Sequence, residues 1–228
     1  MSDWNDGVEF KPIRGQSASR DLAWMVKDLS ERRDVAGLLA YLGAGYPPAT
    51  RRAAAKALVQ ITPAERVPEI LTLLATETDR GVNLSLIQTL GRLADDRALP
   101  SLFQLFKQRD ATLRVEAAIA LSRYNSETAY NALQQGLSQK GASDDYLLRQ
   151  YSAEALGQMG DRRAVTALIN SLKDENSFVR AAAATGLGNL GDKRATEALL
   201  RSRHNEGHAI GVDCAECNAI DVALQKLA

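Results

Sequence analysis

One eleven-residue pattern occurs five times along the chain and constrains its fold more than any other feature. The copies read RRAAAKALVQI from Arg51, NLSLIQTLGRL from Asn83, RVEAAIALSRY from Arg114, RQYSAEALGQM from Arg149 and RAAAATGLGNL from Arg180. Polar turns and a second apolar segment separate the copies. Each unit therefore predicts a helix A, a short turn, a helix B and a turn rich in Gly and Asp. Such units cannot cover their own apolar faces, so they stack on one another.

The repeat predicts an all-α fold, a right-handed α-solenoid of about six helical repeats. Aromatic residues make up only 5% of the chain, which favours closely packed helices over a sandwich or a barrel. Residues 1–20 are expected to form an irregular N-terminal arm, and 21–228 the solenoid. Leu22, Met25, Val26 and Leu29 follow helical spacing and predict a capping helix over Asp21–Leu29. The predicted units lie near 34–62, 63–93, 94–124, 125–159, 160–190 and 191–228.

The spacing within helix B predicts a packed face and a polar face. Counted from the first residue of each copy, offsets three, four, seven and ten are small or apolar and share one stripe. Offsets five and nine point the other way, and only Ile119 is apolar there. Stacking would align these positions into a polar ribbon, expected on the concave side, and either this is a partner-binding surface or it is an ordinary solvated helix face. The polar ribbon consists of Lys56, Gln60, Gln88, Arg92, Arg123, Glu154, Gln158, Thr185 and Asn189.

An arginine opens four of the five copies, and Asn83 opens the other. Its place beside the packed stripe predicts a buried stem whose guanidinium bonds to carbonyls or to an Asp of the preceding turn. The expected acids are Asp174 for Arg180 and Asp110 for Arg114. A structural ladder is favoured over a binding role.

Every histidine and cysteine of the chain lies near its end, in HNEGHAIGVDCAEC. Asp213 and Glu216 have the spacing of a capping box, which would put both cysteines in the first turn of the last helix. Cys-x-x-Cys next to two histidines predicts a metal site. The thiols could instead be a redox pair or hold an iron–sulfur cluster. The remaining alternative is a plain helix cap, in which Cys217 takes the place of the leading arginine. The four candidate ligands are His204, His208, Cys214 and Cys217.

Charge and composition exclude several classes of function. The chain has 28 basic and 28 acidic residues, so no global charge draws it to nucleic acid or to an anionic membrane. The N-terminus has no leader pattern, and two cysteines make no disulfide framework, which together predict a cytoplasmic protein. The chain has no glycine-rich phosphate loop after a strand and no supported Ser-His-Asp arrangement. A stand-alone small-molecule enzyme is therefore not favoured.

The run AEALGQMGDRRAVTALINSLKDENSFVRAAAATGLGNLGDKRATEALL resembles the HEAT-like repeats of the cyanobacterial bilin lyase family. Arg-Ala-Ala, Ala-Leu-Gly, Gly-Asp, Arg-Ala and Leu-Leu recur in each unit of that family, and the resemblance spans roughly Asp34 to Leu200. It implies a helper that assists attachment of a linear tetrapyrrole (phycobilin) to phycobiliproteins, or its removal. The implied partners are a phycobiliprotein subunit and a second HEAT-like subunit.

The resemblance leaves two alternatives to the bilin role. A related HEAT-like protein is a partner of an iron–sulfur scaffold protein, which implies a non-enzymatic metal-delivery role for the terminal His/Cys cluster. The other alternative is a scaffold without a cofactor. No catalytic residue of the lyases is carried over to this chain, so the resemblance does not decide whether it is itself a bilin lyase or lyase subunit.

Overall fold

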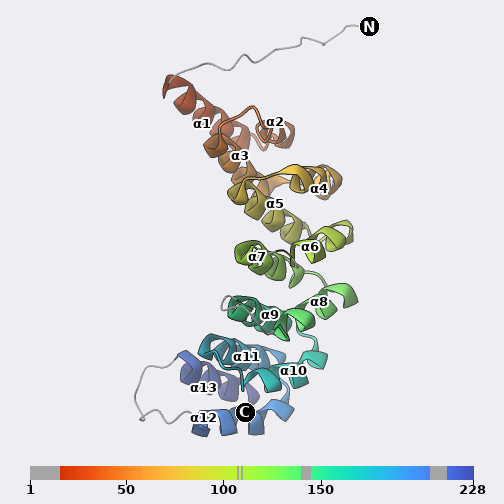
Figure 1. Ribbon diagram of the computed structural model, residues 1–228, viewed down its shortest axis with the longest axis vertical. Helices are drawn as coiled ribbons and strands as arrows, with labels where there is room; N and C mark the ends of the chain where they lie inside the picture. Colours follow the sequence, from red (N-terminus) through yellow and green to blue (C-terminus); the bar gives the residue numbers. More distant parts are fainter. Residues whose placement is uncertain (1–15, 107, 109, 140–144, 206–214) are drawn as a thin grey trace. The chain divides into compact units, whose positions relative to one another are not determined.

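The computed structural model describes residues 16–106, 108, 110–139, 145–205 and 215–228, with side chains over 21–106, 108, 110–139, 146–203 and 215–228 (Figure 1). All regular elements in these ranges are helices, so the predicted all-α fold is confirmed. The chain forms two compact units that divide between Ile61 and Thr62.

The first unit contains α1 (Gln16–Glu31), α2 (Val35–Ala40) and α3 (Pro48–Ile61), and α1 packs against both other helices. Helix α1 includes the predicted capping helix, but it begins at Gln16, inside the segment 1–20 that we expected to be irregular. The stretch QSASR contains neither Gly nor Pro, so nothing in it stops a helix. Asp34 caps α2, because its carboxylate accepts a bond from the Gly37 amide at 2.9 Å.

The second unit consists of two rows of helices, which Figure 1 shows on either side of the stack. In the B row, α5, α7, α9, α11 and α13 pack each against the next; in the A row, α6 packs against α8 and α8 against α10. The B helices are α5 (Arg80–Leu93), α7 (Ala111–Leu121), α9 (Asp145–Met159), α11 (Ser177–Leu190) and α13 (Ala215–Leu227). The A helices are α4 (Val67–Thr76), α6 (Leu99–Phe106), α8 (Glu127–Leu137), α10 (Val165–Ser171) and α12 (Thr196–Asn205). Short 3₁₀ turns precede four of them, at Ala64–Arg66, Asp96–Ala98, Arg162–Ala164 and Lys193–Ala195.

Side-chain caps set where the helices of the second unit begin. Asp79 caps α5, Asp110 caps α7, Ser126 caps α8 and Asn176 caps α11, each by accepting bonds from main-chain amides of the first turn. A cap of this kind stabilises a helix by about 1 kcal/mol. The polar residues between the repeats thus define the ends of the helices.

The core of the second unit is the predicted packed stripe of the B helices. Ala117, Ala118, Leu121 and Tyr124 are all buried, as are the equivalent residues Ala183, Ala184, Leu187 and Leu190 of α11. The Tyr124 hydroxyl donates to the Leu90 carbonyl at 2.9 Å, which joins two successive repeats inside the core. Burial raises the pKa of this phenol, so it stays a neutral donor.

The helices of the described part are too short or too polar to cross a bilayer.

Candidate functional site

The B helices carry the polar ribbon on their exposed face. In the first unit, Lys56 and Gln60 of α3 are exposed. In the second unit, Gln88, Gln158, Thr185 and Asn189 are exposed, and Arg92 and Glu154 are half-buried. Arg123 is also exposed, but it lies just beyond α7, which ends at Leu121. These positions are therefore reachable by a partner.

Four ribbon residues line one groove between α9, α11 and α13, with a volume of about 270 Å³. Glu154 and Gln158 line it on the α9 side, and Thr185 and Asn189 on α11. The small residues Ala181 and Ala182 of α11 also line the groove. The groove is therefore a hollow along α11, open at its surface.

The groove depends on very close packing between the B helices. A Cβ atom on Gly157 of α9 would lie 2.3 Å from the Gly186 Cα of α11, and one on Gly188 would lie 2.8 Å from the Ala223 Cα of α13. Contacts this short leave no room for a larger residue. The glycines of ALGQM and TGLGNL therefore bring the backbones together, and the side chains on the exposed face stand near one another.

Few polar groups of the groove are bonded within the described part of the chain. Gln150 Nε2 donates to Glu154 Oε1 at 3.1 Å, and Lys226 Nζ donates to Asn189 Oδ1 at 2.8 Å. Lys226 stands at offset nine from Cys217, so the ribbon position recurs on α13.

Beside the ribbon residues Gln88 and Arg123 lies a carboxylate that the sequence pattern missed. Glu116 is half-buried and bonds to Gln88, with Arg123 nearby. Burial raises the pKa of Glu116, and the bond from Gln88 and the charge of Arg123 oppose that rise. Its signal in the sequence was an acid at offset two, beside the packed stripe, where no other copy has one.

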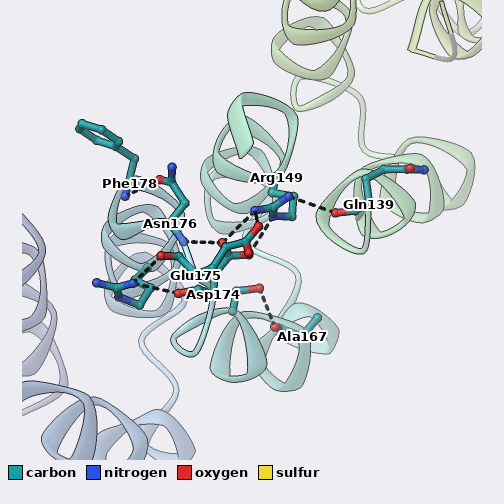
Figure 2. A network of polar contacts seen from close by, with 9 residues as sticks. Gln139, Arg149, Ala167, Asp174, Glu175, Asn176 and Phe178 are labelled. Carbon is teal, nitrogen blue, oxygen red and sulfur yellow. Dashed lines mark hydrogen bonds and ion pairs between the residues drawn. The ribbon is translucent and has the colours of Figure 1, made fainter. Parts of the chain in front are cut away.

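Two leading arginines, Arg149 of α9 and Arg180 of α11, form a ladder of ion pairs with acids of the next repeat. Figure 2 shows the polar network around Arg149. Arg149 of α9 is 6% exposed and binds Asp174 with two bonds, Nε to Oδ2 at 2.8 Å and Nη2 to Oδ1 at 3.0 Å. It also bonds to Glu175 Oε1 at 3.2 Å and to the Gln139 carbonyl at 3.3 Å. The bonds to Asp174 raise the pKa of Arg149. This near-saturated geometry supports a structural role.

The predicted bonds to carbonyls of the preceding turn are confirmed for Arg180 and for Arg114, which donates to the Gln108 carbonyl at 3.0 Å, but the pairing with the named acids differs from the prediction. The Asp174 carboxylate pairs with Arg149 of the preceding repeat. Arg180 instead donates to the main-chain carbonyls of Asp174 and Glu175 at 2.9 and 3.1 Å. Likewise Asp110 caps α7 and pairs with Arg80 of α5 at 3.2 Å.

The reason is the stacking of the B helices. The start of one helix lies level with the turn that opens the next, so each ion pair joins two repeats.

Glu216 also differs from the expected capping role. It is 2% exposed, and its carboxylate pairs with Arg180, Nε to Oε1 and Nη2 to Oε2 both at 2.8 Å. It stands where the other B helices have Val or Leu, for example Val179 and Leu148. Arg180 satisfies this buried charge, so Glu216 continues the ladder into α13.

A second set of ion pairs occurs in the turns that open the A helices. Asp95, Asp161 and Asp192 each cap a 3₁₀ turn and bind the arginine two residues later, at 2.6 to 2.7 Å for the shortest contact. These bonds lower the pKa of Asp95 and of Asp192 to about 2. The Asp-x-Arg sequence is thus a turn motif of the repeat.

The predicted metal site lies largely outside the described residues. His208, Cys214 and the side chain of His204 are not described, and Cys217 is half-buried in the first turn of α13. Where side chains are described, no group of three potential ligands comes together. The four-ligand site stays a prediction.

Comparisons with known proteins agree with this architecture. A phycocyanobilin lyase subunit alpha from Thermosynechococcus vestitus is 38% identical over 95 residues, which are 37% of this chain and 34% of that protein. The same subunit from Pseudanabaena tenuis is 41% identical over 81 residues, 33% of this chain and 30% of that protein. The chain thus matches about a third of the length of these curated relatives.

A solved structure and a family model extend the likeness over most of the chain. The complex of CpcE and CpcF of phycocyanin lyase from Nostoc sp. PCC7120 superposes with a TM-score of 0.51 and 18% identity, over 100% of this chain and 98% of that one. This similarity shows the fold alone. The model of HEAT repeats matches residues 35–113, 67–144 and 137–210. The chain therefore belongs to the HEAT-repeat family.

Proposed function

We propose that this chain is a HEAT-repeat helper in bilin chromophore attachment to phycobiliproteins, or in bilin removal. The observation that carries the proposal is the 38% identity over 95 residues to a phycocyanobilin lyase subunit alpha. The polar ribbon supports it, because a row of exposed amides and charges suits recognition of a folded client.

The proposed mechanism is positioning. A thioether forms when a client cysteine adds its S–H across a carbon–carbon double bond of the bilin, the sulfur binding one carbon and the proton going to the tetrapyrrole. This addition needs no oxidant or reductant. A protein that holds the client and the bilin in one orientation raises the rate and selects one stereoisomer. Such a helper needs a surface that binds and orients, and the ribbon and its groove offer one.

The proposed partners are a phycobiliprotein subunit as client and a second HEAT-like subunit as companion. The companion is suggested by the Nostoc structure, which is a complex of two chains. Both partners and a location in the cytoplasm belong to the proposal.

The test is reconstitution of bilin attachment. The apo α subunit of phycocyanin is mixed with phycocyanobilin, with and without equimolar amounts of this chain, and also with a candidate second HEAT-like subunit. Covalent bilin is measured by mass and by absorbance after denaturation. We expect a higher rate and one dominant adduct spectrum when the chain is present. An unchanged rate and isomer mixture, with no complex on gel filtration, would contradict the proposal.

The predicted metal or iron–sulfur role of His204, His208, Cys214 and Cys217 stays an alternative. Metal and sulfide analysis of anaerobically purified protein tests it separately. Stoichiometric metal that is lost in a Cys214→Ala, Cys217→Ala double variant would support a delivery partner. If the chain shows no bilin activity and contains no metal, the remaining alternative is a scaffold without a cofactor.

A further inference from the structure

Among the described residues that line the groove along α11, Glu154 is the one with a charged side chain. This carboxylate is half-buried, and Gln150 satisfies one of its oxygens with the bond of 3.1 Å. No cation pairs with it in the described part of the chain. A carboxylate that is partly removed from water and lacks a counter-ion favours a cationic group in the space beside it.

An exposed aromatic ring stands at one end of the same groove. Phe178 is 55% exposed and stacks on Tyr146 of α9, with ring centroids 6.4 Å apart. In Figure 2, Phe178 points away from the polar network of Arg149 and Asp174. A large apolar ring that is fixed by a neighbour and left in water is typical of a contact surface.

Small side chains line the groove together with Glu154 and Phe178. They include Ala181 and Ala182 of α11 and Ala219 of α13, which leave room for a partner segment. Within the described residues, the groove therefore combines a carboxylate without a cationic partner, an exposed ring and several small side chains on three stacked helices.

We propose that this groove binds a segment of a protein partner that places a Lys or Arg side chain against Glu154 and an apolar side chain against Phe178. The occupant follows from charge complementarity with Glu154. The inference rests on the proposed function only in that the chain binds a protein client; it adds the site and the chemistry of the bound segment.

The test is site-specific photo-crosslinking in cells of the source organism. p-Benzoylphenylalanine replaces Thr185, which is exposed in the groove, and crosslinked peptides are identified by mass spectrometry. The matched control carries the same group at Thr166, which is exposed on α10 in the A row. Circular dichroism verifies folding, and Gln158 serves as a second groove position if the Thr185 variant does not fold.

The charge of Glu154 is then varied. Glu154→Gln keeps the shape and removes the charge, and we expect roughly a threefold to fivefold lower crosslink yield. Glu154→Lys should abolish the crosslink, and a Lys→Glu change in the identified partner segment should restore it. Glu197→Gln, which removes an exposed acid of α12, should leave the yield unchanged.

Three outcomes would overturn the proposal: a Thr185 yield no higher than that at Thr166, a yield insensitive to Glu154→Lys, or a crosslinked segment without Lys or Arg. Failure of the bilin assay is distinguishable from these. Glu154-dependent crosslinks in a chain that does not assist bilin attachment would keep the groove and change the client. Bilin assistance without such crosslinks would keep the function and remove the groove.

Discussion

The two sides of α9 and α11 differ in where their polar groups find partners. At the opening turns, Arg149 and Arg180 are nearly buried, and each bonds to a carboxylate and to main-chain carbonyls. On the exposed face of the same helices, Gln158 and Thr185 have no bonding partner within the described residues, and Asn189 has only the exposed Lys226. The first region joins the repeats, and the second is available to another molecule.

This difference shows how one repeat divides its positions between two tasks. At offset zero, Arg149 and Arg180 form the ladder, whose ion pairs cross from one repeat to the next. Offsets five and nine carry mostly exposed polar side chains, two of which, Gln158 and Thr185, have no bonding partner within the described residues. We therefore expect changes at the ladder to affect stability first, and changes on the ribbon to affect binding first.

The largest expected effect is on the ladder itself. Arg149→Ala leaves Asp174 partly buried without its partner, which should lower the free energy of unfolding by about 3 kcal/mol. Urea unfolding followed by circular dichroism measures this loss. The matched control is Arg201→Ala, whose pair with Glu197 is exposed, so a change of at most about 0.5 kcal/mol is expected. Equal losses in the free energy of unfolding for the two variants would contradict the prediction, because they would show that burial does not make the Arg149 pair more stabilising than the exposed one.

The next largest effect concerns the close packing beneath the groove. Gly157→Ala puts a methyl group 2.3 Å from the Gly186 Cα, so α9 and α11 must move apart. We expect a loss of about 1–3 kcal/mol in thermal or urea unfolding. Gly45→Ala is the control, since no atom lies within 4 Å of its added Cβ. A neutral Gly157→Ala would mean that the helix row adapts and that the groove is not fixed by this contact.

The periodic part of the molecule could be predicted from the sequence, since it depends on spacing alone. The buried stripe of Ala117, Ala118, Leu121 and Tyr124 follows from offsets on a helix. The sequence predicted that the leading arginines bond to acids of the turns, but it paired Asp174 with Arg180 of its own repeat and not with Arg149 of the preceding one. Spacing along the chain does not reveal which helix packs beside a given turn. From the sequence alone, Asp174 could pair with either Arg180 or Arg149. The packing of the helices places it against Arg149.

The candidate site was predictable position by position, but not as a groove. Glu154, Gln158, Thr185 and Asn189 share offsets, and the structure brings them around one hollow. Phe178 and Gln150 were missed, since their offsets carry no regular residue type across the repeats. The hollow arises from the small size of Ala181 and Ala182, whose consequence depends on what stands on both sides of them.

A carboxylate that is bonded to an arginine should also make stability depend on acid pH, unlike the uncharged side chains of the ribbon. The bonds with Arg194 lower the pKa of Asp192 from its ordinary 3.8 to about 2. A lowered folded-state pKa contributes stability that is present above pH 4 or so and is lost as the pH falls toward 2. Asp192→Asn keeps a good N-cap but removes the charge, so the fall in Tm between pH 4 and pH 2 should become smaller. An identical Tm profile for the variant would mean that the pair with Arg194 does not contribute to acid unfolding.

The smallest expected effect on stability, and the sharpest contrast with the ladder, lies on the ribbon. Gln158→Ala and Asn189→Ala remove exposed polar groups, so the free energy of unfolding should change by at most about 0.5 kcal/mol each. Both side chains line the groove, so binding of the apo phycocyanin α subunit should weaken by roughly twofold to fivefold, as measured by calorimetry or fluorescence anisotropy. Asn170→Ala, an exposed change on α10 in the A row, is the control and should alter neither quantity. If the two ribbon variants destabilise the fold as much as Arg149→Ala does, the ribbon belongs to the scaffold, and the division of the repeat into a joining edge and a binding face is wrong.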